Sequence, residues 1–408
     1  MRYNNYHKHD HRGNPWTMDV AVKEEDYVRR AVELGHTTCF TVNHGMPGSI
    51  FHWLDFADNN NLKLIYGMEA YYVKDRFEKD GSNRHMILIA KNNNGFEQLN
   101  DIMSESFQTG FYSRPRIDYE LLMGLNGSDF IVTTACVAGI WNDTELILTL
   151  NNKFRGNFFL ELQNHNFDLQ KDVNRKMLEL HESMGIPIIH GNDSHYIYPE
   201  DSKYRDIFLK GKGFAYSHED EMILDYPDSD KIFERYEKQG VVSYEQVAKA
   251  LDSTLIFDDC EKITEIDTEI KLPSVSDNPY KELVSICNRN WKEMKKAIPF
   301  GQTITNGLGE SFSYKTEKEY VDAIQYELNI IRETNMANYF LIDNKVVNIA
   351  TEKYGGVLTK TGRGSAPSFF VTKLLGLTNI DRISAPITLF PTRFMSKERI
   401  LGTKSLPD

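Results

Sequence analysis

Two histidines stand near the N-terminus with one residue between them. On an extended strand, His7 and His9 would project from the same face, where their imidazoles can share or bridge metal ions. Further side chains of metal-ligating type follow along the chain, namely His44, Glu69, Cys136, Asp193 and His195. Such a set suits Zn²⁺, Mn²⁺ or Fe²⁺ better than Mg²⁺, which prefers oxygen ligands. Adjacent metals can activate a water and stabilise the leaving oxygen of a phosphoester, so these residues indicate phosphoester hydrolysis.

Six short runs rich in β-branched and aromatic residues are predicted strands, and they would position these side chains. They cover residues 37–42, 62–66, 86–91, 130–134, 158–163 and 186–190. An amphipathic stretch at 24–34, followed by Gly35, predicts a helix. Alternating strands and helices predict an α/β fold, either a barrel or a doubly wound sheet. In a barrel the carboxyl ends of the strands converge on one rim, and several candidate ligands directly follow a predicted strand.

The composition is typical of a packed soluble chain. Its 408 residues correspond to two or three domains of ordinary size, and 40% of them are hydrophobic. No stretch approaches the ~18 uninterrupted apolar residues of a membrane-spanning helix, and the polar N-terminus lacks the apolar core of a signal peptide. The four cysteines are scattered, without a CxxC pair. We therefore expect a cytoplasmic protein with no membrane partner.

Charge is distributed unevenly along the chain. The formal net charge of −12 argues against a general affinity for nucleic acid. Residues 345–408, however, hold ten Lys and Arg against four acids, a net charge of +6. We expect this basic segment to meet phosphate, while the acidic remainder does something else.

A proline-containing stretch near residue 272 predicts a boundary between two domains, 1–271 and 272–408. The second domain is expected to contain helices at 317–333 and 340–353, a strand at 356–359 and a helix at 366–375. Between this strand and the last helix lies Gly362-Arg363-Gly364-Ser365. Its backbone N–H groups and a helix N-terminus capped by Ser365 would suit a triphosphate, and an ordinary turn with an N-cap is the alternative.

Several short motifs together resemble a known family. In the first domain they are His7-Lys8-His9, Thr41-Val42-Asn43-His44-Gly45, Gly67-Met68-Glu69-Ala70-Tyr71, Arg84-His85-Met86, Thr134-Ala135-Cys136 and Asn192-Asp193-Ser194-His195. In the second they are Asn338-Tyr339-Phe340-Leu341-Ile342, Gly362-Arg363-Gly364-Ser365-Ala366, Arg393-Phe394 and Leu406-Pro407-Asp408. The first set resembles the polymerase-and-histidinol-phosphatase (PHP) domain. The second resembles the first half of the palm of the C-family replicative DNA polymerases of bacteria. The resemblance implies a PHP-type distorted (βα) barrel followed by a partial α/β polymerase palm.

The PHP resemblance implies a metal-dependent phosphoesterase, similar in some members to a 3′→5′ exonuclease. It carries nine metal-ligand positions over to His7, His9, Asp19, His44, Glu69, His85, Cys136, Asp193 and His195. These residues would hold two or three divalent ions, with Zn²⁺ or Mn²⁺ expected, and His9 and Asp193 would have catalytic roles. Two alternatives remain open, a free-standing PHP phosphatase acting on a small phosphoester and a non-catalytic scaffold that stabilises the palm.

The palm resemblance implies nucleotide chemistry. Arg363, Gly364 and Ser365 match a loop that holds the phosphates of the incoming nucleotide, and Asp408 matches the first carboxylate of an Asp-x-Asp pair that holds Mg²⁺. One carboxylate cannot organise two metals, so we expect this polypeptide alone not to polymerise DNA, as for an incomplete or split gene product. The expected partners of the complete protein are primer–template DNA, a dNTP and the remaining polymerase half or other replisome subunits.

Overall fold

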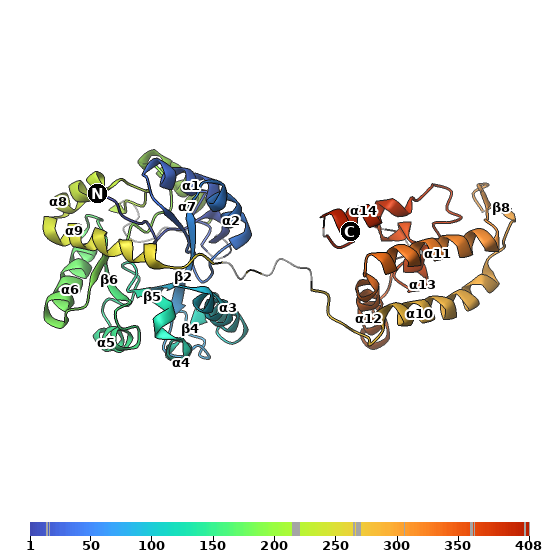
Figure 1. Ribbon diagram of the computed structural model, residues 1–408, viewed down its shortest axis with the longest axis horizontal. Coiled ribbons are helices and arrows are strands. Elements are labelled where there is room, and N and C mark those ends of the chain that lie inside the picture. Colours follow the sequence, from blue (N-terminus) through green and yellow to red (C-terminus); the bar gives the residue numbers. More distant parts are fainter. Residues whose placement is uncertain are drawn as a thin grey trace. The chain divides into compact units, whose positions relative to one another are not determined.

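The computed structural model describes residues 1–13, 15, 17–213, 221–263, 266, 271–305, 307–359, 362, 364–403 and 405–407 (Figure 1). The chain divides into two compact units, Met1–Ile266 and Asp267–Asp408. No helix in the described ranges combines the length and the apolar character that a membrane span needs.

The first unit is built on one curled sheet. Its strands lie in the order β1 (Thr38–Thr41), β2 (Lys63–Tyr72), β3 (Arg84–Ala90), β5 (Phe130–Thr133), β6 (Phe158–Leu162) and β7 (Ile188–His190), and β4 (Arg116–Ile117) pairs with the end of β2. β3 runs antiparallel to β2 and β5, and the other pairs are parallel. The N-terminal segment forms an isolated parallel bridge, Lys8 with Ser194, after the end of β7, where the N–H of His9 donates to the carbonyl of Ser194 at 2.8 Å.

Helices lie around the outside of this sheet (Figure 1). They are α1 (Glu24–Glu33), α2 (Ile50–Asn59), α3 (Asn93–Gln108), α4 (Tyr119–Gly124), α5 (Thr144–Lys153), α6 (Asp168–Met184), α7 (Ser202–Gly211), α8 (Ser229–Gln239) and α9 (Tyr244–Ser253). Along β3, Met86 and Leu88 belong to the core cluster that includes these helices, whereas Ile87 and Ile89 belong to a second cluster formed with the other strands. Burial on both faces is the pattern of a barrel wall covered by helices.

The sheet contains a strand at each of the six predicted positions, and β2 runs six residues beyond the predicted end. This extension pairs with β3, from Gly67 opposite Ile89 to Tyr72 opposite Arg84. A Cβ at Gly67 would lie 2.8 Å from the carbonyl oxygen of Leu88, so glycine permits this close strand pairing. The extension also carries Glu69 into the interior.

The regular structure in the described part of the second unit is helical except for one hairpin. Its helices are α10 (Pro279–Met294), α11 (Glu317–Glu333), α12 (Ala337–Tyr354), α13 (Phe370–Leu374) and α14 (Lys397–Thr403), and the hairpin joins β8 (Thr303–Thr305) to β9 (Ser311–Ser313). A separate core holds these helices together and includes Leu283, Cys287, Tyr320, Phe340 and Phe370. α11 has the predicted bounds, and α12 contains the predicted helix at 340–353.

Two predictions for the second unit were wrong. The predicted strand at 356–359 has no regular structure, and Val357 is 91% exposed, so it lacks the burial that would favour pairing. The predicted helix at 366–375 is split into a 3₁₀ turn, Ala366–Ser368, and α13. Phe369 between them is extended, with φ −111° and ψ 129°, and its buried ring packs against Phe340 and Phe394. Core packing of this ring therefore overrides helical continuity.

Candidate metal centre

The N-terminal segment delivers two histidines to the interior of the first unit. His7 and His9 are fully buried, and their rings lie 5.6 Å apart between centroids. Lys8 between them points to the other side, where its ammonium lies 3.9 Å from the ring centroid of Trp53. This alternation of an extended segment places both imidazoles on one face, as the spacing predicts.

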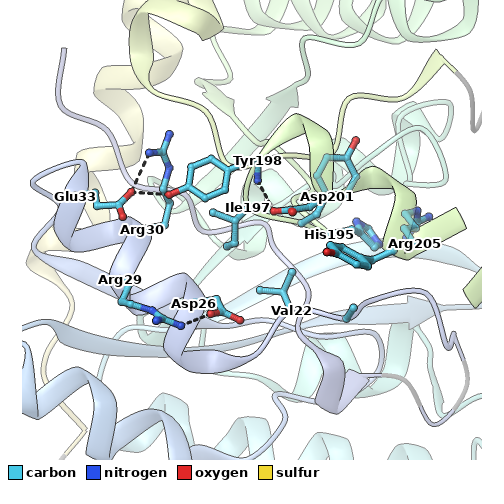
Figure 2. Close-up of a pocket in the computed structure, with 13 residues that line it drawn as sticks. Val22, Asp26, Arg29, Arg30, Glu33, His195, Ile197, Tyr198, Asp201 and Arg205 are labelled. Atoms are coloured by element: carbon cyan, nitrogen blue, oxygen red, sulfur yellow. Dashed lines mark hydrogen bonds and ion pairs between the residues drawn. The ribbon is translucent and has the colours of Figure 1, made fainter. Parts of the chain in front are cut away.

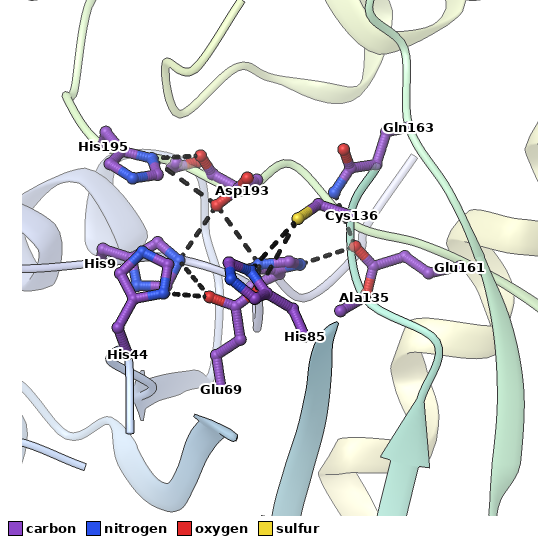
Figure 3. A network of polar contacts seen from close by, with 12 residues as sticks. His9, His44, Glu69, His85, Ala135, Cys136, Glu161, Gln163, Asp193 and His195 are labelled. Carbon is purple, nitrogen blue, oxygen red and sulfur yellow. Dashed lines mark hydrogen bonds and ion pairs between the residues drawn. The ribbon is translucent and has the colours of Figure 1, made fainter. Parts of the chain in front are cut away.

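Glu69 lies at the centre of the cluster that these histidines enter (Figure 3). Its two carboxylate oxygens lie 2.6 Å from Nδ1 of His44 and 2.9 Å from Nδ1 of His85. Nε2 of His7 and Nε2 of His9 each lie 3.4 Å from a carboxylate oxygen of Glu69. Glu69 is fully buried on β2, and its neighbours come from the N-terminal segment, the end of β1 and β3.

Asp193 closes the opposite side of the cluster. Its Oδ1 lies 3.0 Å from Nε2 of His9 and 3.3 Å from Nε2 of His7. The backbone of Asp193 is left-handed, with φ +52°, in the turn that follows β7. His195 is two residues further on, and its Nε2 lies 3.7 Å from Oδ2 of Asp19. Asp is among the few residues that adopt this conformation readily, which allows the turn to direct its carboxylate inward.

Cys136 completes the set from the end of β5. Its thiol sulfur lies 3.6 Å from Nδ1 of His85 and 3.8 Å from Oε1 of Glu69. The structure thus brings all nine sequence-predicted ligand positions together, although their sequence numbers range from 7 to 195.

Glu161 also belongs to this cluster and was not predicted. Its Oε1 lies 2.6 Å from Nδ1 of His7, and its Oε2 accepts hydrogen bonds from Tyr6 at 2.6 Å and Thr133 at 2.8 Å. Gln163 donates to Oε1 at 2.8 Å. The signal in the sequence was a single acid inside the apolar run of β6, because a buried carboxylate requires polar partners.

Electrostatics favour the anionic forms of the central acids. Burial opposes ionisation, but the imidazoles of His85 and His44 hold the pKa of Glu69 well below its usual range. The charge of His7 does the same for Asp193. In turn, although burial opposes protonation of His7, Glu161 and Asp193 raise its pKa well above 6.5. The buried carboxylates therefore favour the protonated form of His7.

His9 has the opposite character, because burial and the neighbouring His44 lower its pKa to about 3. A neutral imidazole is the form that binds a metal. For Cys136, burial and the charge of Glu69 raise the pKa of the thiol well above its usual range. A bound cation would oppose this effect, since metal binding favours the thiolate.

The donor atoms fit a group of divalent cations. Several buried atoms lie close to one another as ion pairs but make no hydrogen bond of good geometry among the described residues, including Nε2 of His7 and His9, Oε2 of Glu69 and Oδ1 of Asp193. Buried polar atoms are normally satisfied, so such atoms facing one another indicate a binding site for cations. Three groups of potential ligands have donor atoms within 4.8 Å of one another, and they are His9, His44 and His195; His7, His9 and Glu69; and His44, Glu69 and His85.

Two pockets adjoin the cluster. One, of about 390 Å³, opens over the candidate ligands and is bordered by Tyr71 and Arg114, whose guanidinium lies 4.8 Å from the Tyr71 ring centroid. Figure 2 shows the other, of about 480 Å³, between α1 and the segment that follows β7. His195 and Arg205 line both pockets. The candidate metal site is therefore reached from a surface that carries arginine and tyrosine side chains.

The structure describes only some of the residues that are predicted to bind a nucleotide in the second unit. Arg363 and Asp408 lie outside the described residues. Gly364 has φ +79°, which suits glycine in a turn. The side chain of Ser365 makes no capping hydrogen bond; its carbonyl instead accepts one from the N–H of Ser368 at 2.9 Å. The prediction that Ser365 caps a helix was therefore wrong, because a 3₁₀ turn occupies the expected first turn.

Two family models match the chain in order. Residues 7–182 match the PHP domain, and residues 299–408 match the bacterial DNA polymerase III alpha NTPase domain. The first unit, with its curled sheet and its cluster of candidate ligands, is thus similar to the PHP domain over residues 7–182. A solved amidohydrolase from Chromobacterium violaceum aligns with a TM-score of 0.32 and 12% identity, over 47% of this chain and 87% of that chain.

Curated relatives extend the match to almost the whole chain. The DNA polymerase III subunit alpha of Aquifex aeolicus is 29% identical over 428 residues, which cover 96% of this chain and 34% of that protein. That of Borreliella burgdorferi is 27% identical, with the same two coverages. The chain is homologous to the N-terminal part of DNA polymerase III alpha subunits, and it spans about a third of the length of these relatives.

Proposed function

We propose that the PHP domain of this chain is a metal-dependent phosphoesterase that removes nucleotides from DNA 3′ ends. The observation that carries this proposal is the convergence of buried histidine nitrogens and carboxylate oxygens around Glu69 without hydrogen bonds of good geometry among the described residues. Two or three divalent ions, Zn²⁺ or Mn²⁺, would be held by the nine ligand positions. Mixed nitrogen, oxygen and sulfur donors favour these ions over Mg²⁺.

When bound, such ions polarise a phosphoryl oxygen and lower the pKa of a water molecule. The residues of the chain prepare the site for them. Glu69 faces histidines with both carboxylate oxygens and would hold cations together with them. His9 and Asp193, 3.0 Å apart, are assigned to catalysis because one is neutral and the other ionised near pH 7. Glu161 holds the ring of His7 through Nδ1, which leaves Nε2 facing the cluster.

The homologous polymerase subunits support DNA as the substrate class. Arg114 lines the pocket over the candidate ligands, where a guanidinium can bind a phosphate oxygen of the strand. For the second unit, we propose primer–template DNA, a dNTP and other replisome subunits as partners. Arg363, Gly364 and Ser365 are its proposed phosphate-binding residues, and Asp408 is its proposed Mg²⁺ ligand.

The test is release of nucleotides from a 3′-labelled, mismatched primer–template with Mn²⁺ or Zn²⁺. We expect the unaltered chain to release single nucleotides and the His9→Ala, Asp193→Asn variant to lose at least 100-fold in rate. A matched control is His52→Ala, Asp55→Asn, because these residues are exposed on α2. It should retain full activity.

Other outcomes would favour the alternatives. Hydrolysis of p-nitrophenyl phosphate without cleavage of DNA would favour a phosphatase of small phosphoesters. A chain that purifies without metal and is inert towards both substrates with added Zn²⁺ or Mn²⁺ would favour a scaffold.

A further inference from the structure

A polar groove runs between α10 and α12 in the second unit. Its volume is about 610 Å³. The side chains that matter here are Lys281, Ser285 and Arg289 on α10 and Asn344, Lys345 and Asn348 on α12. Glu282 is the only acid among the described residues that line it. The groove therefore combines cations with neutral hydrogen-bonding groups, which are the groups that contact nucleic-acid phosphates.

Among the described residues, no acid forms an ion pair with the cations of this groove. Lys281 and Arg289 are exposed, and neither makes an ion pair with a described residue. Lys345 donates to a backbone carbonyl at 2.6 Å, which leaves its charge uncompensated. By contrast, Lys295 and Lys296, in the 3₁₀ turn that follows α10, each pair with a glutamate, at 2.8 and 2.6 Å. Positive charge at the groove is thus available to an external anion.

The cations on α10 form a row. Lys281 and Arg289 lie on one face of the helix with Ser285 midway between them, at intervals of four residues. Lys292 continues this row and lines an adjoining hollow of about 500 Å³. At a rise of 1.5 Å per residue, Lys281 and Lys292 lie about 16 Å apart along the helix axis. One strand of B-DNA places about five phosphates over that length.

Packing fixes both walls of the groove. Leu283 and Cys287 of α10 and Phe340 and Leu341 of α12 belong to the same buried core. In addition, the side chain of Asn344 donates to the carbonyl of Leu375 at 2.7 Å. Rigid helices keep the cations in place before a ligand arrives, which lowers the ordering cost of binding.

We propose that this groove binds the phosphate backbone of duplex DNA. No aromatic side chain is present among the described residues that line it, whereas sites for single strands use aromatic rings on which bases stack. Cations with amide and hydroxyl groups instead suit a backbone whose bases remain paired. The inference rests on the proposal that DNA is a partner of the chain, and it does not depend on hydrolysis at the metal centre.

The test is equilibrium binding of the full chain to a fluorescein-labelled 20-base-pair duplex, measured by anisotropy between 50 and 200 mM salt. EDTA is present, so cleavage plays no part. We compare the unaltered chain with a groove variant, K281A/R289A/K345A, and with a control variant, K74A/K79A/K318A. The control removes the same charge from exposed lysines elsewhere.

The plot of log K against log salt has a negative slope, and loss of three phosphate contacts should make it less steep by about 2.7. The fourfold increase in salt would then reduce the duplex affinity of the unaltered chain about 40-fold more than that of the groove variant. The control variant should keep the slope of the unaltered chain. An unchanged slope in the groove variant, or an equal loss in the control, would overturn the proposal. Stronger competition by single-stranded DNA than by duplex would overturn the choice of ligand.

A second measurement needs no variant. Bound duplex should protect Lys281 and Lys345 from amine acetylation in the unaltered chain, and Lys318 should remain reactive. Equal labelling of all three with and without duplex would contradict the proposal. If the chain binds duplex in this way but releases no nucleotides with Mn²⁺, the groove proposal stands and the exonuclease proposal fails.

Discussion

Replacing Glu161 by Gln should weaken metal binding without removing any candidate ligand. The change preserves the shape of the side chain but removes the negative charge 2.6 Å from Nδ1 of His7. The new amide nitrogen must also face groups that now donate to the carboxylate, including Tyr6 at 2.6 Å and Thr133 at 2.8 Å. At least one existing hydrogen bond to the carboxylate is therefore lost, because an amide nitrogen does not accept.

The magnitude follows from the geometry around His7. Its Nε2 lies 3.4 Å from Glu69 and 3.3 Å from Asp193, so the tilt of this ring decides whether the atom reaches a shared cation. Losing a carboxylate that orients a ligand histidine typically costs 10- to 100-fold in metal affinity. This corresponds to about 1.4–2.7 kcal/mol. The variant should also leave His7 with a lower pKa, because the charge of Glu161 contributes most to raising it.

The assay is a competition titration of Zn²⁺ between the full chain and a chromogenic chelator at pH 7. Glu179→Gln is the matched control, since Glu179 is exposed on α6 and pairs with Lys176 at 3.1 Å on the surface. We expect the Glu161 variant to lose at least tenfold in affinity and the control to match the unaltered chain. An affinity within twofold of the unaltered chain, in a variant with an unchanged circular dichroism spectrum, would refute the role of Glu161.

Three further changes test the same unit. In Gly191→Ala, the new Cβ would lie 2.2 Å from Oε1 of Glu161, so Zn²⁺ affinity should fall as it does in the Glu161 variant; the same titration checks this. Asp225→Asn breaks a buried ion pair with Arg235, whose contacts are 2.6 and 2.8 Å, and should lower the free energy of unfolding by about 3–5 kcal/mol in urea denaturation. Burial and nearby arginines lower the pKa of His36 from 6.5 to about 4. Between pH 6.5 and about 4 the unfolded chain therefore binds a proton that the folded chain does not, and the free energy of unfolding falls as the pH decreases through this range. In His36→Phe, the slope of the unfolding free energy between pH 6 and 4.5 should therefore be shallower by up to about 1.4 kcal/mol per pH unit, and identical slopes would contradict this reasoning.

Local sequence patterns were sufficient to predict an element when its own residues determine its structure. Strand β3 shows this, because its alternating residues divide between two buried faces and the apolar run alone predicts a strand. The same holds for α11, which begins after Thr316 with a capping box and has the predicted bounds. Local patterns failed at Phe369, where burial of one aromatic ring against distant helices outweighs helix propensity.

The sequence by itself determined the chemical character of this protein. The residue types, the His-x-His spacing and the positions after strands predict a cluster of metal ligands and phosphoester chemistry, and these features depend only on neighbours in the chain. Tertiary structure alone decided which donors meet. The pairing of Glu161 with His7 joins residues 154 positions apart, and that distance depends on strand order and register across the sheet. Periodicity does not encode the strand order, so the sequence marks Glu161 as an acid in an apolar strand, but its contact with His7 is visible only in the folded chain.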